Sequence, residues 1–143
     1  CMLDTDVLSE FLRGNENVTA KAEEYLQEHG VISFGIITYY EVLNGLLYKD
    51  AKKQLEKFER FAEMSRIVPM TLRTVQISAK IQADLRKKGT VIGHTDTLIA
   101  GIAIANNLQL ITNNTAHFSR IKKLKIDNKK NFNFILLKIY WHC

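Results

Sequence analysis

The sequence predicts an α/β domain built on a mostly parallel sheet. Short apolar runs rich in β-branched residues alternate along the chain with longer segments whose apolar residues recur every three or four positions. The length of 143 residues fits one domain with a core of its own. A composition of 46% hydrophobic and 24% charged residues is typical of a globular chain.

Five short segments have the composition of strands. The second, VISFGII, is a continuous β-branched apolar run of the length expected for a strand buried on both faces. Pro69 indicates that the third strand ends there or lies at a sheet edge, because proline cannot donate to the ladder. The expected strands are residues 1–4, 31–37, 66–70, 108–112 and 124–126.

The segments between the strands have helical periodicity and helix-boundary residues. Thr5 or Asp6 is the expected N-cap of the first helix, and the pattern Thr38-x-x-Glu41 indicates a capping box at the start of a later one. The last long helix is apolar nearly all round, so we expect it to be fully buried. The expected helices are residues 5–14, 17–30, 38–50, 51–65, 72–89 and 95–107, with one helical turn within 113–121.

Several classes of function are disfavoured by what the chain lacks. No G-x-G-x-x-G follows a strand and no G-x-x-x-x-G-K-[ST] occurs, which argues against dinucleotide and P-loop chemistry. Cys1 and Cys143 support neither a disulfide framework nor a cysteine zinc site, and the four histidines show no metal-binding spacing. The longest apolar run, residues 98–105, is too short to span a bilayer, so we expect a cytoplasmic protein without membrane contact.

The positive charge is concentrated near the end of the chain. The net charge is +5, and residues 120–143 carry seven Lys and Arg against one acid, so the preceding chain is close to neutral. Such a run can attract nucleic-acid phosphates, and it can equally be a solvated lysine-rich surface.

Three acids fall at junctions of the expected elements. Asp4 ends the first strand, Glu41 lies one turn into the helix after the second, and Asp96 opens the apolar helix. Strand-to-helix junctions of a parallel sheet share one edge, where open α/β sheets place their ligands. Each acid also has a purely structural interpretation as a helix-capping or first-turn residue.

A cluster of these acids would need a cation. Two carboxylates about 4 Å apart repel by roughly 4 kcal/mol at an effective dielectric constant of about 20. A third acid requires a counter-charge, raised pKa values, or both. Mg²⁺ and Mn²⁺ prefer oxygen ligands of this kind, and such an ion can activate water and stabilise charge on a phosphoryl group.

Several ordered motifs resemble those of the PIN-domain nucleases of the VapC toxin type. They are MLDTDVLSEFLRG, ISFGIITYYEVLNGLL and HTDTLIAGIAIANNLQLITNNTAHFSRI. The resemblance implies a three-layer α/β/α fold with a central, mostly parallel sheet of four to five strands. It also implies an endoribonuclease that depends on Mg²⁺ or Mn²⁺, a cognate antitoxin that binds and blocks the enzyme, and a homodimer.

The resemblance assigns the family's acidic positions one at a time. The three metal ligands fall on Asp4 in LDTD, Glu41 in TYYEVL and Asp96 in HTDTLIA. The fourth catalytic position, acidic in many members, falls on Asn114 in TNNT, so this chain has an amide without a negative charge there.

The resemblance also divides the chain. Residues 1–128 correspond to the PIN domain, and residues 129–143 form an atypical C-terminal extension. Thr112 lies close enough to the implied site to orient a ligand or substrate, and Asp6 stands where the family frequently has asparagine.

We therefore expect a metal-dependent endoribonuclease toxin that hydrolyses RNA phosphodiester bonds with metal-activated water. One alternative is a non-catalytic PIN-like module that binds RNA or protein. A second is a phosphatase of the haloacid dehalogenase kind, suggested by the D-x-D pattern of LDTDVL. That signature needs Thr or Val four residues after the first Asp, and Leu8 stands there.

Overall fold

A computed structural model describes residues 1–13 and 30–128. Within them, five strands form one sheet in the order β3-β2-β1-β4-β5, with every neighbouring pair parallel. The strands are β1 (Met2–Leu3), β2 (Ser33–Gly35), β3 (Arg66–Val68), β4 (Leu110–Thr112) and β5 (Ile126–Asn128). The predicted helix 17–30 lies almost entirely outside the described residues, and the extension 129–143 lies wholly outside them.

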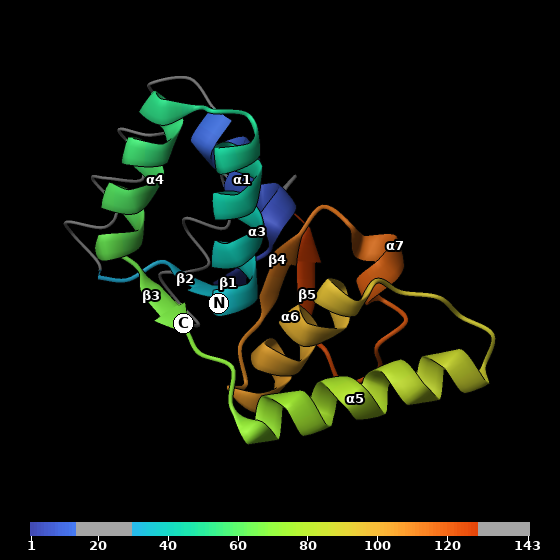
Figure 1. The fold of residues 1–143 in the computed structure, drawn as a ribbon. Coiled ribbons are helices and arrows are strands. Elements are labelled where there is room, and N and C mark those ends of the chain that lie inside the picture. The colour runs from blue at the N-terminus through green and yellow to red at the C-terminus, as the bar shows by residue number, and fades with distance from the viewer. Residues whose placement is uncertain (14–29, 129–143) are drawn as a thin grey trace.

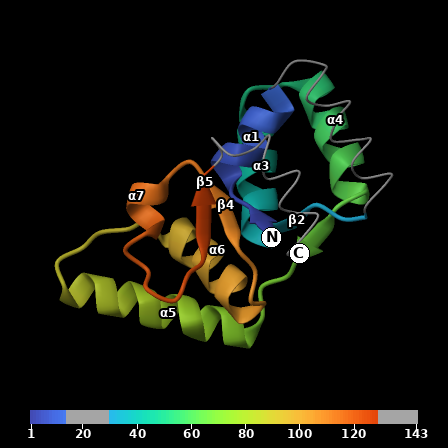
Figure 2. The ribbon, with the colours of Figure 1, turned by 180° about the vertical axis from the view of Figure 1, so that it is seen from behind.

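Helices cover both faces of the sheet, which confirms the predicted three-layer architecture. Figures 1 and 2 show α1, α3 and α4 grouped on one side of the strands, with α5 and α6 on the other. The helices are α1 (Thr5–Arg13), α3 (Ile36–Tyr48), α4 (Lys52–Glu63), α5 (Leu72–Lys87), α6 (His94–Ala105) and α7 (Thr115–Phe118). None of the helices among the described residues has the length and apolar character needed to cross a membrane.

Two hydrophobic clusters hold the layers together, one on each face. Leu3, Phe34 and Ile111 belong to the cluster that packs on α1, α3 and α4. Met2 and Leu110 belong to the other, with α5 and α6. Adjacent residues of one strand enter opposite clusters because successive side chains point to opposite faces of a sheet. Both faces are therefore buried, as continuous apolar strands predict.

A glycine sets the close packing of α5 against α6. A Cβ built on Gly101 would lie 2.0 Å from Ser78 Oγ and 2.8 Å from the carbonyl oxygen of Thr74. No real Cβ contact is that short, so only glycine lets the two helices approach this closely. Through this contact the core-facing side of α6 is fixed, and with it the position of Asp96 at its start.

Three predicted boundaries were wrong. The strand 31–37 ends at Gly35, whose extended backbone makes it the N-cap of α3, so residues 36 and 37 are helical. The predicted capping box does not form: Thr38 lies inside α3, and no side chain caps that helix. In α1, the cap is Asp4 and not Thr5 or Asp6, because Leu8 N–H donates to the Asp4 carbonyl oxygen at 3.0 Å.

Other predicted features are confirmed in whole or in part. Pro69 follows β3, which forms one edge of the sheet. One short helix occupies the predicted turn within 113–121. Helix α6 is the predicted apolar helix but is not fully buried: six of its 12 residues are buried, and His94 at its start is exposed. The last strand, predicted at residues 124–126, lies at residues 126–128.

Candidate active site

The centre of the candidate site is the Asp4 carboxylate at the end of β1. This strand lies between β2 and β4, so Asp4 is in the middle of the sheet edge at which the strands end. Its side chain is only 5% exposed. One carboxylate oxygen accepts a hydrogen bond from the Thr5 backbone N–H at 2.8 Å, and the other accepts from the Thr112 hydroxyl at 2.7 Å. The carboxylate is therefore held by two donors from different elements.

Burial makes ionisation of Asp4 costly. The pKa of Asp4 is raised from 3.8 to about 7, mainly by desolvation and to a lesser extent by the negative charges of Asp6 and Asp96, against the lowering effect of the two hydrogen bonds. An effect of Asp96 on this pKa means that the two carboxylates are near enough to repel each other. The fold thus brings together acids that are 92 positions apart in the chain.

Glu41 reaches the same region through Thr5. The Thr5 hydroxyl donates a hydrogen bond to the Glu41 carboxylate and lies 3.4 Å from the hydroxyl of Thr38. Thr5 directly follows Asp4, and its backbone N–H binds the Asp4 carboxylate. A single residue therefore links the first and second predicted acids. This bridge replaces the capping box that the sequence suggested for Glu41.

Asp96 lies in the first turn of α6 and is contacted by His117. The His117 Nδ1 atom is 3.4 Å from Asp96 Oδ2 and 2.9 Å from the Asn114 side-chain nitrogen. The same nitrogen cannot serve both partners at once: Nδ1 donates to Asp96 when it carries the proton and accepts from the Asn114 amide when it does not. His117 therefore lies between Asn114 and Asp96, and its tautomer decides which of the two it bonds.

His117 is a site residue that the sequence did not predict. The four histidines are scattered without metal-binding spacing, and nothing in the linear pattern connects His117 with Asp96. The available signal was local: His117 lies three residues after Asn114, which places the two side chains on one face of a helical turn. His94, at the start of α6, is exposed.

Thr112 and Asp6 support the centre from β4 and α1. The Thr112 hydroxyl donates to Asp4 and also accepts from the Asn114 backbone N–H at 3.0 Å, so it orients both residues. Asp6 accepts from its neighbour Val7 N–H at 2.6 Å and from Asn113 N–H at 3.2 Å, which ties α1 to the end of β4. This agrees with a supporting position for Asp6.

The fit of a divalent cation depends on the donor chemistry. Across residues 1–13 and 30–128 no group of three or more His, Cys, Asp or Glu side chains is arranged to hold a metal ion, so the three-ligand set stays a prediction. Asp4 and Asp96 offer the carboxylate oxygens that Mg²⁺ and Mn²⁺ prefer. Asp4, whose pKa is raised by burial and then by neighbouring negative charges, also lacks the positive charge that a cation would supply. The donor chemistry therefore fits a hard divalent ion.

Comparison with known proteins identifies the class that this fold and site define. The PIN domain family matches residues 1–124. Ribonuclease VapC1 of Methanocaldococcus jannaschii is 32% identical over 130 residues, 90% of this chain and 87% of its own. Ribonuclease VapC2 of Rickettsia felis is 29% identical over 128 residues, 89% of this chain and 96% of its own. The chain therefore belongs to the PIN-domain family.

A solved structure extends this likeness to three dimensions. The VapBC2 complex of Rickettsia felis, bound to a promoter DNA fragment, contains a chain that superposes with a TM-score of 0.76 at 26% identity. The superposition covers 89% of this chain and 96% of that one. The predicted resemblance to VapC-type nucleases is confirmed, and the haloacid dehalogenase alternative loses its basis.

Proposed function

We propose that this protein is a metal-dependent endoribonuclease toxin of a toxin–antitoxin pair. The ribonuclease class has direct support from its VapC relatives. The observation that carries the proposal for this chain is Asp4: a buried carboxylate at the active edge of a parallel sheet, repelled by the Asp96 charge. Retaining such an arrangement without a function would be costly to folding.

In the proposed mechanism, Asp4 and Asp96 would hold a Mg²⁺ or Mn²⁺ ion, and Glu41 would complete the cluster or position the water. The bound ion would supply the chemistry that activates water and stabilises charge on the phosphoryl oxygens. The chain's own residues prepare the site. Thr112 fixes the Asp4 carboxylate, Thr5 holds one oxygen of Glu41, and both leave the acids oriented before substrate arrives.

The fourth position acts through hydrogen bonds and not through charge. Asn114 and Asp96 both lie within reach of His117 Nδ1, and an amide at position 114 adds no negative charge to the repulsion there. We propose that Asn114 positions Asp96 or a water molecule near it. This is consistent with a site whose central acid already has a raised pKa.

The test is loss of RNA cleavage on neutralising either central acid. Asp4→Asn and Asp96→Asn each remove one charge with little change of shape, and each is expected to lower cleavage by at least about 100-fold while the protein stays folded. Asp50→Asn is the matched control, because Asp50 is exposed and has a positive φ of 50° that asparagine also tolerates. Full activity in either site variant, or in excess chelator, would refute the proposal.

One observation favours the alternative of a non-catalytic module. The described residues contain no preformed group of three metal-binding side chains. Calorimetric titration with Mn²⁺ distinguishes the two functions. The enzyme binds the ion and loses binding on Asp4→Asn, whereas a non-catalytic module shows no binding at millimolar concentrations of the ion.

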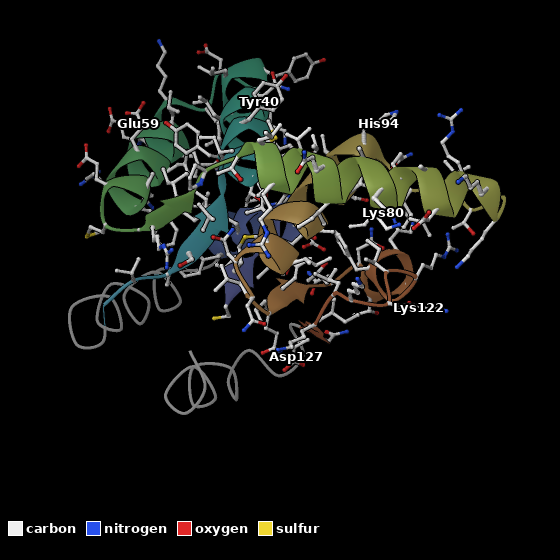
Figure 3. All side chains as sticks on the ribbon, turned by 90° about the horizontal axis from the view of Figure 1, so that it is seen from below. Tyr40, Glu59, Lys80, His94, Lys122 and Asp127 are labelled. Carbon is white, nitrogen blue, oxygen red and sulfur yellow. The ribbon has the colours of Figure 1, made fainter. Side chains whose placement is uncertain are left out.

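The partners and location follow from the same proposal. A groove of about 120 Å³ between α1, α3 and α4 has Glu41, Val42 and Leu46 among its lining residues, and a segment of the cognate antitoxin would cover it. We propose that the protein forms a homodimer in the cytoplasm. Exposed apolar side chains on α3, including Tyr40 and Leu47, offer a surface for self-association that light scattering can test (Figure 3).

A further inference from the structure

A second groove, beside α5, has none of the candidate metal ligands among its lining residues. Its volume is about 410 Å³, and it lies between α5, the end of α6 and the segment that follows α7. The floor is aliphatic: Leu85 and Ile121 are buried, and Ile81 is partly buried. We call this feature the α5 groove.

The α5 groove is rimmed by positive charge. Six cationic side chains line it against a single carboxylate, that of Asp84. Three come from α5 and the residue after it, and three from the segment after α7: Arg73, Lys80, Lys88, Arg120, Lys122 and Lys123. Figure 3 labels one from each wall, Lys80 and Lys122.

The positive charge is available for binding. All six cationic side chains are exposed. Asp84 lies 3.8 Å from Lys80, and both are well exposed, so this pair is weak. In the part of the chain that the structure describes, the other five make no ion pair. Such a concentration of uncompensated charge attracts a polyanion.

The groove is adjacent to the candidate active site through α7. This four-residue helix carries His117, which contacts Asp96, and the next turn carries Arg120. The Arg120 backbone N–H donates to the His117 carbonyl oxygen at 3.3 Å. A polyanion that reaches Asp96 therefore needs to pass only one helical turn to meet the first cation of the groove.

The lining indicates how the polyanion is held. Among the described residues, no aromatic side chain lines the groove, so these residues offer no ring on which a base could stack. Lysines bind phosphates as point charges, whereas aliphatic side chains can contact ribose. These features suit a nucleic-acid backbone bound without base readout.

We propose that the α5 groove binds the phosphate backbone of the RNA substrate outside the cleaved bond. This inference rests on the proposed ribonuclease function and adds an accessory binding surface to it. The surface holds long or structured RNA while Asp4 and Asp96 act on one bond. A short oligonucleotide that occupies only the site would gain nothing from it.

The experiment compares two triple variants of the full chain. Lys88→Gln/Lys122→Gln/Lys123→Gln removes three charges from both walls of the groove. Lys52→Gln/Lys53→Gln/Lys57→Gln removes three charges from exposed positions on α4, away from the groove, and is the matched control. Binding of bulk tRNA is measured in excess chelator over a range of salt concentrations, so that no cleavage occurs. Cleavage is then measured with metal on tRNA and on a dinucleotide, an oligonucleotide too short to occupy the site and the groove together.

The groove variant is expected to bind tRNA at least about tenfold more weakly at low salt. The slope of log K against log salt concentration should become shallower by about 2, because each of the three lost phosphate contacts contributes about 0.7 to it. Its KM for tRNA rises with kcat unchanged, and cleavage of the short oligonucleotide matches that of wild type. The α4 variant behaves as wild type throughout.

Two results would overturn the inference, and both are distinct from failure of the enzymatic proposal. One is an unchanged salt slope in the groove variant while wild type cleaves RNA. The other is an equal loss of tRNA binding in the groove variant and the α4 variant, because equal losses would reflect net charge and not the groove. If wild type cleaves no RNA at all, the proposed function fails, and the binding slopes in chelator still decide whether the groove holds RNA.

Discussion

Replacing Asp4 with asparagine is expected to stabilise the metal-free protein above neutral pH while it abolishes cleavage. Asp4 is 5% exposed, and burial with the charges of Asp6 and Asp96 raises its pKa from 3.8 to about 7. Ionisation of this carboxylate therefore costs more free energy in the folded state than in the unfolded state. Asparagine has nearly the same shape and no charge, so it removes that cost.

The size of this cost follows from the pKa of Asp4 in the unfolded chain, 3.8, and in the folded protein, about 7. Below about pH 4 the acid is protonated in both states and the cost is absent. Between about pH 4 and 7 the unfolded chain releases the proton and the folded chain keeps it, so the free energy of unfolding falls by about 1.4 kcal/mol per pH unit. Above that range the cost is constant at about 4 kcal/mol. An altered hydrogen bond to Thr112 or Thr5 costs Asp4→Asn about 1 kcal/mol, which leaves a net gain of about 3 kcal/mol.

The assay is urea denaturation of wild type and Asp4→Asn in chelator, at about pH 4 and about pH 8. We expect Asp4→Asn to be about 1 kcal/mol less stable than wild type at the lower pH and about 3 kcal/mol more stable at the higher one. Asp50→Asn is the control and should track wild type at both. A difference between wild type and Asp4→Asn that does not change with pH would refute the reasoning, because it would mean that Asp4 titrates normally.

Two further predictions concern packing and the orientation of Asp4. Gly101→Ala places a Cβ against the α5 backbone and is expected to lower the free energy of unfolding by about 3 kcal/mol. In the control variant Gly45→Ala the new Cβ has no atom within 4 Å, so the better helix propensity of alanine should raise the free energy of unfolding by about 0.5–1 kcal/mol. Denaturation of both variants checks this, and equal effects would contradict the close helix contact. Thr112→Val removes the hydroxyl that binds Asp4, so the pKa of Asp4 rises above about 7 and stability falls by about 2 kcal/mol at about pH 8. The loss should be smaller at about pH 4, and denaturation at both pH values would contradict the assignment if it shows the same loss at each.

Much of the architecture could be predicted because it depends on local composition. The alternation of β-branched runs with helical periods predicted the parallel sheet between two layers of helices, and Pro69 predicted an edge for β3. The boundary at Gly35 could not be predicted, because the residues IIT that follow it have strand propensity. They are helical because the chain must turn at Gly35 to cover the sheet, so tertiary packing overrides a weak local preference.

The candidate site was predictable in its acids and not in the residues that connect them. Asp4, Glu41 and Asp96 could be chosen because each follows a strand or opens a helix. Thr5 as the bridge to Glu41, and His117 as the partner of Asp96, could not. Such contacts join side chains of distant elements, and a linear pattern contains no information on which side chains will face one another.

By itself, the sequence determined the class of fold and the family, and it singled out Asp4, Glu41 and Asp96 as candidates. Only the tertiary structure decided that the central acid is buried with a raised pKa, and that six cationic side chains from separate segments rim one groove. The physical reason is the distance along the chain over which each effect acts. Hydrophobic periodicity and strand length act over neighbouring residues, whereas desolvation and charge repulsion depend on distances that exist only after the helices have packed on the sheet.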